Sequence, residues 1–405
     1  MKAMKLTLIL GSLFIFLMSF SPVSAQLKIN SSGNIELEGA SSTIVSLNGT
    51  PFTFKVSNVL AGFTGGSSNS NMSFGYSALR NSLAGYHNTA VGYSALSNNA
   101  TGTSNTAVGY SALSTNTTGT YNTANGFNSL RLNTGSANTA TGSTSLEFNL
   151  SGSNNTANGS AALYQNTTGN GNTAIGCNAL NPNTTGSYNT AIGSVALFSN
   201  TKGSYNVAIG YYAGAENPDS LSNSIAIGYA AMVTGSHQVI IGNSGIGKIG
   251  GWVNWSNVSD ERVKKNIKAD VPGLNFINGL QPVTYNLDLD AADNLLGIDK
   301  EKKEKRDKDM TQDLKDKNDK ARKDKENIVQ TGFVAQDVEK TAKNIGYNFS
   351  GVNVDESGIY SLSYSEFVVP LVKAVQELSE QNARQQELID KLNARIEQLE
   401  KRRKL

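Results

Sequence analysis

The chain has 405 residues, with 34 basic and 32 acidic side chains and one cysteine, Cys177. A formal net charge of +2 gives no support to a nucleic acid or an anionic membrane surface as a partner. A single cysteine excludes a disulfide within the chain. The charge is also uneven, because only seven charged residues lie between positions 60 and 250. Length and composition therefore predict two or three folded units of different kinds.

The first 25 residues have the pattern of a secretory signal peptide. Two lysines give a basic start, an apolar run follows from Leu6 to Phe20, and small residues precede Gln26. The apolar run is short for a membrane span, so cleavage before Gln26 is favoured over an uncleaved anchor. The sequence predicts an exported protein, secreted or on the cell surface, without a transmembrane segment once the signal is removed. Residues 26–70 are expected to form a β-rich segment whose role the sequence does not assign.

Residues 71–242 contain a repeat with a period of mostly 17 residues. Each copy offers a strand of about four residues, such as Thr89–Gly92, followed by a turn rich in Gly, Asn, Ser and Thr. One copy is too small to bury a core, whereas stacked copies share one, so the array is predicted to form a parallel β-solenoid, or β-roll. The alignment depends on one glycine in each copy: Gly75, Gly92, Gly109, Gly126, Gly142, Gly159, Gly176, Gly193, Gly210, Gly228 and Gly242.

The face of the strand that points inward is predicted from the alternation of side chains. Thr89 and Val91 point to the same face of their strand. Their counterparts later in the array are aliphatic, as in Val207 and Ile209, and we expect this face to be the interior. An interior position also argues against a threonine ladder that binds ice or sugar. Polar residues in the middle of the array favour extra burial by neighbouring chains: Asn125, Thr141 and Asn158.

Two further columns of the repeat are distinctive. Asparagines that precede the strands, as at Asn122, Asn155 and Asn189, are expected to form side-chain ladders or to hold turns. The aromatic column after each glycine either lines the core or forms an exposed stripe, and Cys177, which belongs to it, is expected to be a small apolar filler. Acidic ligands are nearly absent from the array, so no calcium site is predicted. No metal and no cofactor is expected elsewhere in the chain.

The segments NTAIG, NVAIG and SIAIG of the array resemble the head repeats of trimeric autotransporter adhesins of the YadA type. Those heads are left-handed parallel β-rolls in which three chains lie side by side. The resemblance implies a homotrimer with an adhesive or a spacer role. A cell-surface or glycan ligand would fit such a role, but the sequence does not identify one. Residues 243–258 are interpreted as a linker.

Residues 259–366 are predicted to form a small α+β domain interrupted by a charged insertion. The insertion, residues 299–327, contains 12 basic and 10 acidic residues and almost nothing apolar. We expect it to be solvated, either disordered or a lone charged helix. Its mixed signs argue against a nucleic-acid patch. Patterning predicts the other elements in chain order: a short helix over 272–280, strands over 283–287 and 332–335, a helix from Gln336 and a strand over 359–362.

Four segments occur in a fixed order in this domain: SDERVKKNI, LQPVTYNLD, GFVAQDVEK and YSEFVVPLVKAVQEL. They resemble the C-terminal intramolecular chaperone domain of phage tail spikes and fibres, the endosialidase-type auto-processing serine peptidase that is also found in myelin regulatory factor. The resemblance implies that the domain drives trimerisation of whatever precedes it and then cuts itself off. It also implies that Ser259 is the nucleophile, Lys264 the base and Val258–Ser259 the scissile bond.

The proposed dyad makes physical demands on its surroundings. A lysine serves as a base only in its neutral form, which removal from water favours. Residues five apart face away from each other on a helix or a strand, so Ser259 and Lys264 meet only across a bend or between chains. We therefore expect trimer assembly to trigger cleavage. The alternative is that Ser259 or Asp260 caps a helix and the lysines are solvated. His87 and His237 lie in the array, so no histidine is available locally.

The C-terminal residues 367–401 contain five heptads, which predict a coiled coil formed with copies of the same helix. The alternative is an amphipathic helix packed on its own domain. β-branched a residues with leucine at d favour two strands, whereas both resemblances imply three chains, and we expect three. The a positions are Val368, Val375, Asn382, Ile389 and Ile396, and the d positions are Leu371, Leu378, Gln385, Leu392 and Leu399.

The sequence therefore predicts a mostly β, homotrimeric, exported fibre or adhesin-like protein. Its parts are a parallel β-solenoid, a small α+β chaperone domain and a coiled-coil helix. The enzyme activity implied by the resemblance is a single-turnover serine endopeptidase with a Ser-Lys dyad that acts on its own chain. The alternative is a surface binding or structural fibre with a permanent, uncleaved trimerisation domain. A phage tail-fibre component is disfavoured, because phage fibres assemble in the cytoplasm and need no signal peptide.

Overall fold

The computed structural model describes residues 71–82, 84–214, 220–252, 255–298, 300–308 and 310–403, apart from the side chains of residues 302, 305 and 306. Nearer the N-terminus it describes the backbone of four strands. The predicted signal peptide and the remainder of 26–70 lie outside the described residues. The chain forms two compact units, one up to Thr185 and the other from Gly186. The four strands are β1 (Gln26–Ile29), β2 (Ile35–Glu38), β3 (Thr53–Val56) and β4 (Val59–Thr64).

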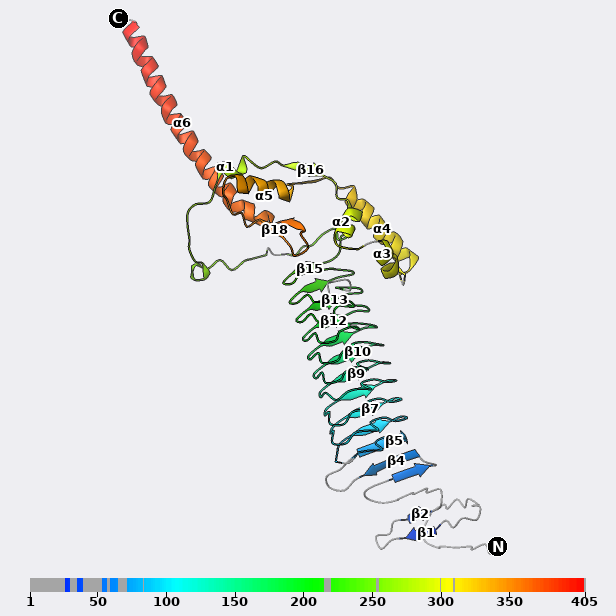
Figure 1. Cartoon of the computed structure of the whole chain (residues 1–405). Helices are drawn as coiled ribbons and strands as arrows, with labels where there is room; N and C mark the ends of the chain where they lie inside the picture. The colour runs from blue at the N-terminus through cyan, green and yellow to red at the C-terminus, as the bar shows by residue number, and fades with distance from the viewer. Residues whose placement is uncertain are drawn as a thin grey trace. The chain divides into compact units, whose positions relative to one another are not determined.

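In the first unit, one short strand from each repeat builds a parallel sheet (Figure 1). β1 pairs with β2, and β3 with β4 and β4 with β5, in antiparallel fashion. From β5 onward the pairing is parallel and in register, with Ala90 opposite Ala107 and Ala107 opposite Ala124. The predicted parallel β-solenoid is therefore confirmed. Its strands here are β5 (Asn71–Tyr76), β6 (Thr89–Val91), β7 (Thr106–Val108), β8 (Thr123–Asn125), β9 (Thr139–Thr141), β10 (Thr156–Asn158) and β11 (Thr173–Ile175).

The interior of the solenoid is lined by alanine and leucine, so the predicted inward face of the strands is wrong. In β8 the middle residue, Ala124, is buried, whereas Thr123 and Asn125 are exposed. Leu130, four residues after the repeat glycine, is also buried. A three-residue strand turns only its middle side chain inward, and leucine from the following turn fills the rest of the narrow coil. The columns that contain Thr89 and Val91 therefore lie on the outer face.

The outer face carries the residues that were expected to form the core. Ile175 is exposed, and the threonine column lies at the surface as well, so burial gives no reason to exclude a threonine ladder. The aromatic column is an exposed stripe. Cys177 is exposed in this column and does not fill the core. The rings of Tyr76, Tyr93, Tyr110 and Phe127 stack in sequence with centroids 5.3, 5.0 and 5.4 Å apart.

Two columns of buried asparagine hold successive coils together. The first confirms the predicted ladder: Asn122 Nδ2 donates to the carbonyl of Gly135 (2.9 Å), and its Oδ1 accepts from the backbone N–H of Asn138 (3.0 Å). The second has no counterpart among the predictions, although the spacing Asn-x-x-Gly marks it in most copies. In it, Asn116 Nδ2 donates to Asn99 Oδ1 at 3.0 Å. Its members in this unit are Asn99, Asn116, Asn133, Asn149, Asn166 and Asn183.

The close spacing of the coils determines the repeat glycine and the leucine after it. A Cβ on Gly109, whose φ is +135°, would lie 2.3 Å from the carbonyl oxygen of Gly126, so only glycine fits there. Leu113 has a φ of 52°, which is unusual for leucine. Its side chain is fully buried and its N–H donates to the carbonyl of Ser129 at 3.1 Å. These contacts stabilise the strained backbone.

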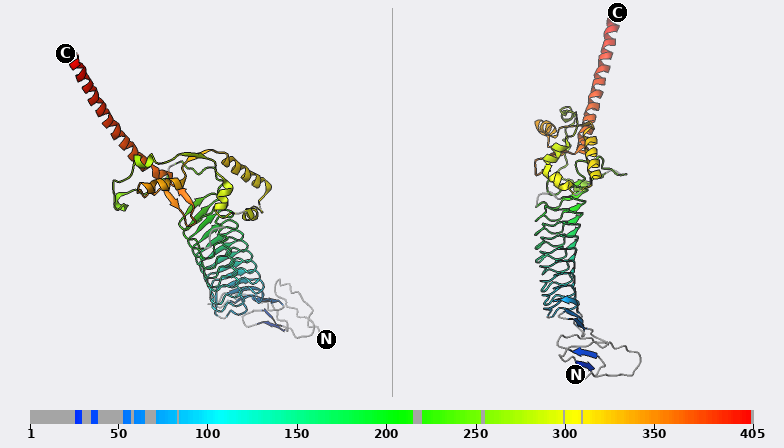
Figure 2. Two further views of the ribbon diagram at one scale, coloured as in Figure 1. Left: turned by 45° about the horizontal axis from the view of Figure 1, so that its top comes forward. Right: turned by 90° about the vertical axis from the view of Figure 1, so that its right-hand side faces the viewer.

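The second unit begins with further coils of the same kind and continues into a small α+β domain (Figure 2). Its coil strands pair in parallel, with Ala191 opposite Ala208 and Ala208 opposite Ala226. The core of the domain consists of Phe276, Val338, Ala342, Phe349 and Phe367. The coil strands are β12 (Thr190–Ile192), β13 (Val207–Ile209), β14 (Ile225–Ile227) and β15 (Val239–Ile241).

The elements of the domain follow the predicted order, with shifted boundaries. The predicted helix over 272–280 and the strands over 283–287 and 359–362 are confirmed in shorter form. The strand expected over 332–335 ends at Gly332, and the next helix begins at Ala335. The elements are η1 (Glu261–Val263), α1 (Leu274–Ile277), β16 (Val283–Tyr285), α2 (Leu289–Leu295), α3 (Lys300–Asp307), α4 (Gln312–Glu326), β17 (Gln330–Gly332), α5 (Ala335–Asn344), β18 (Val352–Val354), β19 (Tyr360–Leu362), η2 (Tyr364–Phe367) and α6 (Val368–Arg403).

The charged insertion is helical, but it is not the disordered or solitary segment that composition predicts. It forms α3 and α4. Lys303 of α3 and Arg322 of α4 both pair with Asp293 of α2, whose side chain is only 3% exposed. This buried carboxylate gives the insertion a tertiary contact. Composition does not reveal the contact, because the partner lies outside the charged segment.

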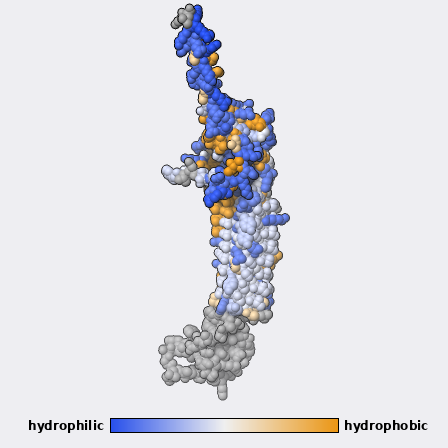
Figure 3. Space-filling view, turned by 90° about the vertical axis from the view of Figure 1, so that its left-hand side faces the viewer, coloured by the Kyte–Doolittle hydropathy of each residue, from blue (hydrophilic) through white to orange (hydrophobic). Residues whose placement is uncertain are grey.

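Helix α6 leaves its predicted heptad seam exposed. Figure 3 shows small hydrophobic patches among the hydrophilic residues towards the C-terminus. Its first turns pack on the domain through the buried residues Pro370 and Ala374, and Glu377 Oε2 accepts from the backbone N–H of Leu274 at 2.8 Å. The apolar a and d residues are 46–64% exposed. The alternative in which the seam packs on its own domain is therefore contradicted. Within the described part of the chain, no helix is both long and apolar enough to cross a bilayer.

Candidate active site

Ser259 and Lys264 lie on an exposed segment that precedes the folded core of the domain. The described residues between 247 and 270 are all exposed, and Val258 is 84% exposed. The first buried residue after this segment is Gly273, next to α1. The candidate site is therefore accessible to solvent in the single chain.

A single turn of 3-10 helix, η1, brings the two residues together. Asp260 caps this turn, and its side chain accepts from the N–H of Arg262 at 2.8 Å. The chain then becomes extended at Lys264, with a φ of −98° and a ψ of 138°. The backbone N–H of Lys264 donates to the carbonyl of Glu261 at 3.0 Å, which closes the bend. The predicted meeting of Ser259 and Lys264 across a bend is therefore what the structure contains.

The side chains of the dyad are in direct contact. Lys264 Nζ donates a hydrogen bond to Ser259 Oγ over 2.8 Å. This distance is within the range for proton transfer between a nucleophile and its base. The contact brings the amine and the hydroxyl within reach of each other in a single chain. Both side chains are exposed to solvent in this chain.

The acidic residue beside Ser259 is engaged elsewhere. Both oxygens of Asp260 are bound by Arg262, from Nε at 2.9 Å and from Nη2 at 2.7 Å. The side-chain hydrogen bonds from Arg262, followed by its backbone N–H, lower the pKa of Asp260 below the ordinary value. Asp260 is therefore the partner of Arg262 and the cap of η1, as the alternative interpretation of SDER predicted for a helix start. Because Asp260 pairs with Arg262, the side chain of Lys264 contacts Ser259 and not Asp260.

Other catalytic groups are distant in sequence or absent among the described residues. His87 and His237 belong to the coils, and His237 Nδ1 hydrogen-bonds Asn223 at 2.9 Å. In the described ranges no cluster of three or more His, Cys, Asp or Glu side chains could hold a metal. Near Ser259 the described residues provide the amine of Lys264 and the Val258–Ser259 peptide bond, all exposed to solvent.

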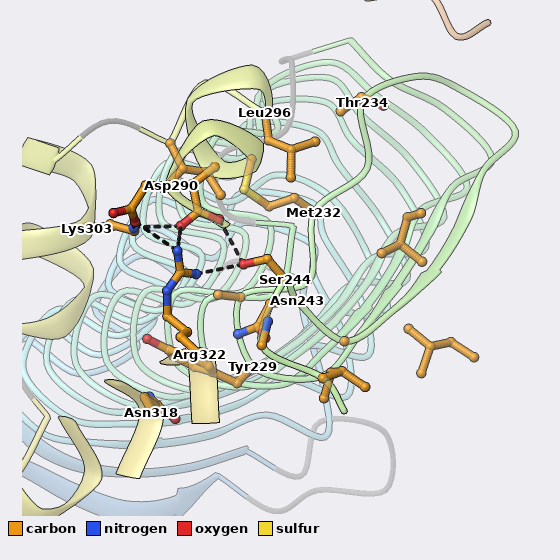
Figure 4. Close-up of a pocket in the computed structure, with 18 of the residues that line it drawn as sticks. Tyr229, Met232, Thr234, Asn243, Ser244, Asp290, Leu296, Lys303, Asn318 and Arg322 are labelled. Atoms are coloured by element: carbon orange, nitrogen blue, oxygen red, sulfur yellow. Dashed lines mark hydrogen bonds and ion pairs between the residues drawn. The ribbon is translucent and has the colours of Figure 1, made fainter. Parts of the chain in front are cut away.

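A second group of polar residues lines a cavity of about 1160 Å³ between the last coil and helices α2 to α4 (Figure 4). Asp290 and Asp293 of α2 face Lys303 and Arg322, with nitrogen to oxygen distances of 2.7–3.0 Å. Ser244, just after β15, donates to Asp293 Oδ1 at 2.8 Å and accepts from Arg322 Nη1 at 2.9 Å. The sequence marks these residues only by an acidic pair directly ahead of a charged insertion.

The C-terminal domain has a recognised family. Residues 259–347 match the family model described as chaperone of endosialidase. No curated protein and no solved structure matches the chain significantly. The match begins at Ser259, the first residue of the dyad, and extends past the end of α5. It covers the first three of the four quoted segments and the charged insertion between them. Residues 259–347 are therefore similar to the chaperone of endosialidase family, and they follow a parallel β-solenoid in this chain.

Proposed function

We propose that the chain is an exported homotrimeric fibre protein whose C-terminal chaperone domain assembles three copies and then cuts the Val258–Ser259 bond. One observation carries the proposal for cleavage. Lys264 Nζ lies 2.8 Å from Ser259 Oγ, and Ser259 is also the first residue of the family match. The signal-like N-terminus supports export. The exposed seam of α6 supports association with copies of the same helix.

The chemistry follows from the position of Ser259 at its own scissile bond. Ser259 Oγ attacks the carbonyl carbon of Val258 while neutral Lys264 Nζ takes the hydroxyl proton. The C–N bond to Ser259 breaks, and Lys264 delivers the proton to the leaving nitrogen. An ester then joins the Val258 carbonyl to Ser259 Oγ. Water hydrolyses this ester to a Val258 carboxylate and a free serine hydroxyl, and the new N-terminal amine is that of Ser259.

In the proposed mechanism, assembly of the trimer removes water from the dyad, which the single chain leaves exposed. In the single chain both dyad residues are exposed, so water solvates the ammonium group of Lys264. Neighbouring chains that cover this segment would remove water, favour the neutral amine and hold the carbonyl in place. Because the substrate and the nucleophile belong to one assembly, a single turnover is sufficient. Cleavage then occurs only in chains that have been brought together correctly.

Substitution of the dyad tests the proposal against a closely matched control. Ser259→Ala and Lys264→Ala chains should remain full length by intact mass and still sediment as trimers. Lys265→Ala removes the same charge one residue later, at another exposed position, and should be cut like the parent chain. Cleavage of either dyad variant, or loss of cleavage in the Lys265 variant alone, would reject the assignment.

The alternative is a permanent trimerisation domain on a surface-binding fibre. The exposure of Ser259 and Lys264 favours it, because nothing in the described single chain removes water from the pair. The same intact-mass measurement separates the two functions. A single full-length trimeric species in the parent protein supports the permanent domain, whereas fragments that end at Val258 and begin at Ser259 support self-processing.

A further inference from the structure

The chaperone domain makes specific contacts with the last coil of the solenoid through its charged insertion. We propose that α2, α3 and α4 form a docking element that fastens the domain to this coil and keeps it bound after the chain is cut. The retention of a cut domain depends on the proposed self-cleavage, whereas the docking does not. The docking element comprises residues 289–326, and the last coil comprises residues 229–246.

The centre of the contact is a partly buried polar network around Ser244, in which the carboxylate of Asp293 is buried. This residue of the coil donates to Asp293 Oδ1 at 2.8 Å and accepts from Arg322 Nη1 at 2.9 Å. Asp293 is also held by Lys303 at 2.7 Å. Two acidic and two basic side chains, including Asp290, balance each other in this network. The hydroxyl of the coil thus completes a network whose other members all belong to the domain.

A polar network with a buried carboxylate at its centre favours one position of the domain on the coil. Asp293 is almost fully buried, so its carboxylate requires its partners. A shift of the domain by one residue would separate Ser244 from both Asp293 and Arg322. Buried ion pairs add little net stability, but they penalise arrangements in which one partner is unpaired. The contact therefore favours a single register between the solenoid and the chaperone domain.

The docking element also satisfies backbone groups at the end of the solenoid. Lys325 Nζ donates to the carbonyl of Ser244 at 2.7 Å and to that of Ile246 at 3.0 Å. Tyr229 Oη, from the same coil, donates to Asp307 Oδ1 at 2.7 Å. The last turn of a solenoid has no further coil to bind its backbone, so terminal caps are a general requirement of such folds. α3 and α4 supply part of this cap.

The opposite side of the contact is formed by the turn between β18 and β19. Thr234 Oγ1 donates to Asp355 Oδ2 at 2.5 Å, and Ser357 Oγ donates to the carbonyl of Thr234 at 3.2 Å. The domain therefore contacts the last coil at two places, and the cavity is lined by both Ser244 and Thr234, which Figure 4 labels. Two separate contacts resist rotation better than one.

The covalent connection contributes little to this docking. Gly247 has open space where a side chain would lie, and the described residues of 247–258 are exposed. The docking contacts join residues 229–246 to residues 293–357, and both groups lie outside the segment that contains the Val258–Ser259 bond. A cut at this bond therefore leaves the contacts intact. We expect the 259–405 fragment to stay bound to the solenoid.

A cut made by an added protease tests docking without relying on self-cleavage. A recognition sequence for a site-specific protease is inserted after Gly250 of the Ser259→Ala chain, and the trimer is cut and passed over a size-exclusion column under native conditions. The parent fragment should elute with the solenoid fragment. Arg322→Ala with Lys325→Ala, and separately Ser244→Ala, should raise the dissociation constant at least about tenfold, equivalent to about 1.4 kcal/mol.

The matched control is Lys317→Ala with Lys320→Ala, which removes the same charge from exposed ion pairs on the same helix. It should retain the fragment like the parent. Ser244→Ala leaves every residue of the domain intact, so its effect cannot arise from a misfolded domain. Release of the parent fragment, or equal retention in all variants, would overturn the docking. The added protease cuts the Ser259→Ala chain, which does not depend on self-cleavage. Failure of docking can therefore be distinguished from failure of self-cleavage.

Discussion

The buried asparagine ladder predicts a large difference between two asparagines of the same coil. Asn122 is fully buried, whereas Asn125, three residues later at the end of β8, is exposed. Replacing Asn122 by alanine leaves the buried N–H of Asn138 without the Oδ1 that accepts it at 3.0 Å, and it removes a 2.9 Å bond to Gly135. The orphaned N–H costs about 1–3 kcal/mol and the lost bond about 0.5–1.5 kcal/mol.

These two terms together destabilise the coil by about 1.5–4.5 kcal/mol. Gly135 keeps a second donor, Asn133 Nδ2 at 2.8 Å, so its carbonyl is not orphaned. Hydrogen exchange of peptides from the coil, followed by mass spectrometry, measures the local free energy of opening. Asn122→Ala should accelerate exchange roughly 10- to 1,600-fold, while Asn125→Ala should leave it within about threefold. Equal rates in the two variants would refute the role assigned to the ladder.

Two further predictions concern assembly and pH. Leu378→Asp places a charge in the α6 seam and removes about 1.5–3 kcal/mol of hydrophobic stabilisation per chain, so sedimentation should show loss of trimers. The control Gln376→Asp, on the outer side of the helix, should keep the trimers. Trimers in both variants would contradict the coiled coil. Burial by itself raises the pKa of Asp355. Hydrogen bonds from Thr234 and from the N–H groups of Ile359 and Ser357 lower this pKa by more than burial raises it, so the pKa of Asp355 lies below its ordinary value. Because the pKa of Asp355 is lower in the folded protein than in the unfolded chain, its carboxylate stabilises the contact at any pH above the unfolded pKa. This stabilisation is lost as the pH falls through the folded pKa. Native chromatography of the cut protein should therefore show release of the fragment below about pH 4, and undiminished retention at pH 3 would count against this contact.

The periodicity of the sequence was sufficient to predict the solenoid architecture of the array, but not which face of each strand is buried. A column of glycine with a small residue two places earlier indicates stacked coils, because one copy cannot bury a core. The same column does not tell which strand face is inward, since both faces of Thr89–Val91 carry residues that tolerate burial. Ala90 is inside because the coil is narrow, and the width of the coil depends on the turn leucines, which lie outside the strand.

The candidate dyad illustrates the same division between local and tertiary information. The spacing of Ser259 and Lys264 allowed the pair to meet only across a bend or between chains. The structure contains the bend, which the capping side chain of Asp260 creates locally. The docking element was not foreseen, because Arg322 lies in a segment with the composition of a solvated helix, and the carboxylate and hydroxyl that hold it are 29 and 78 residues away along the chain.

The sequence by itself determined what is repeated or local: the stacked coils, the asparagine ladder before each strand, the bend at the dyad and the heptads of α6. These features depend on the spacing of side chains along one short stretch of chain. Only the tertiary structure decided which columns are buried and where the charged insertion binds. Burial and ion pairing depend on residues distant in sequence, because the free energy of a buried charge or side chain is set by all the atoms that surround it.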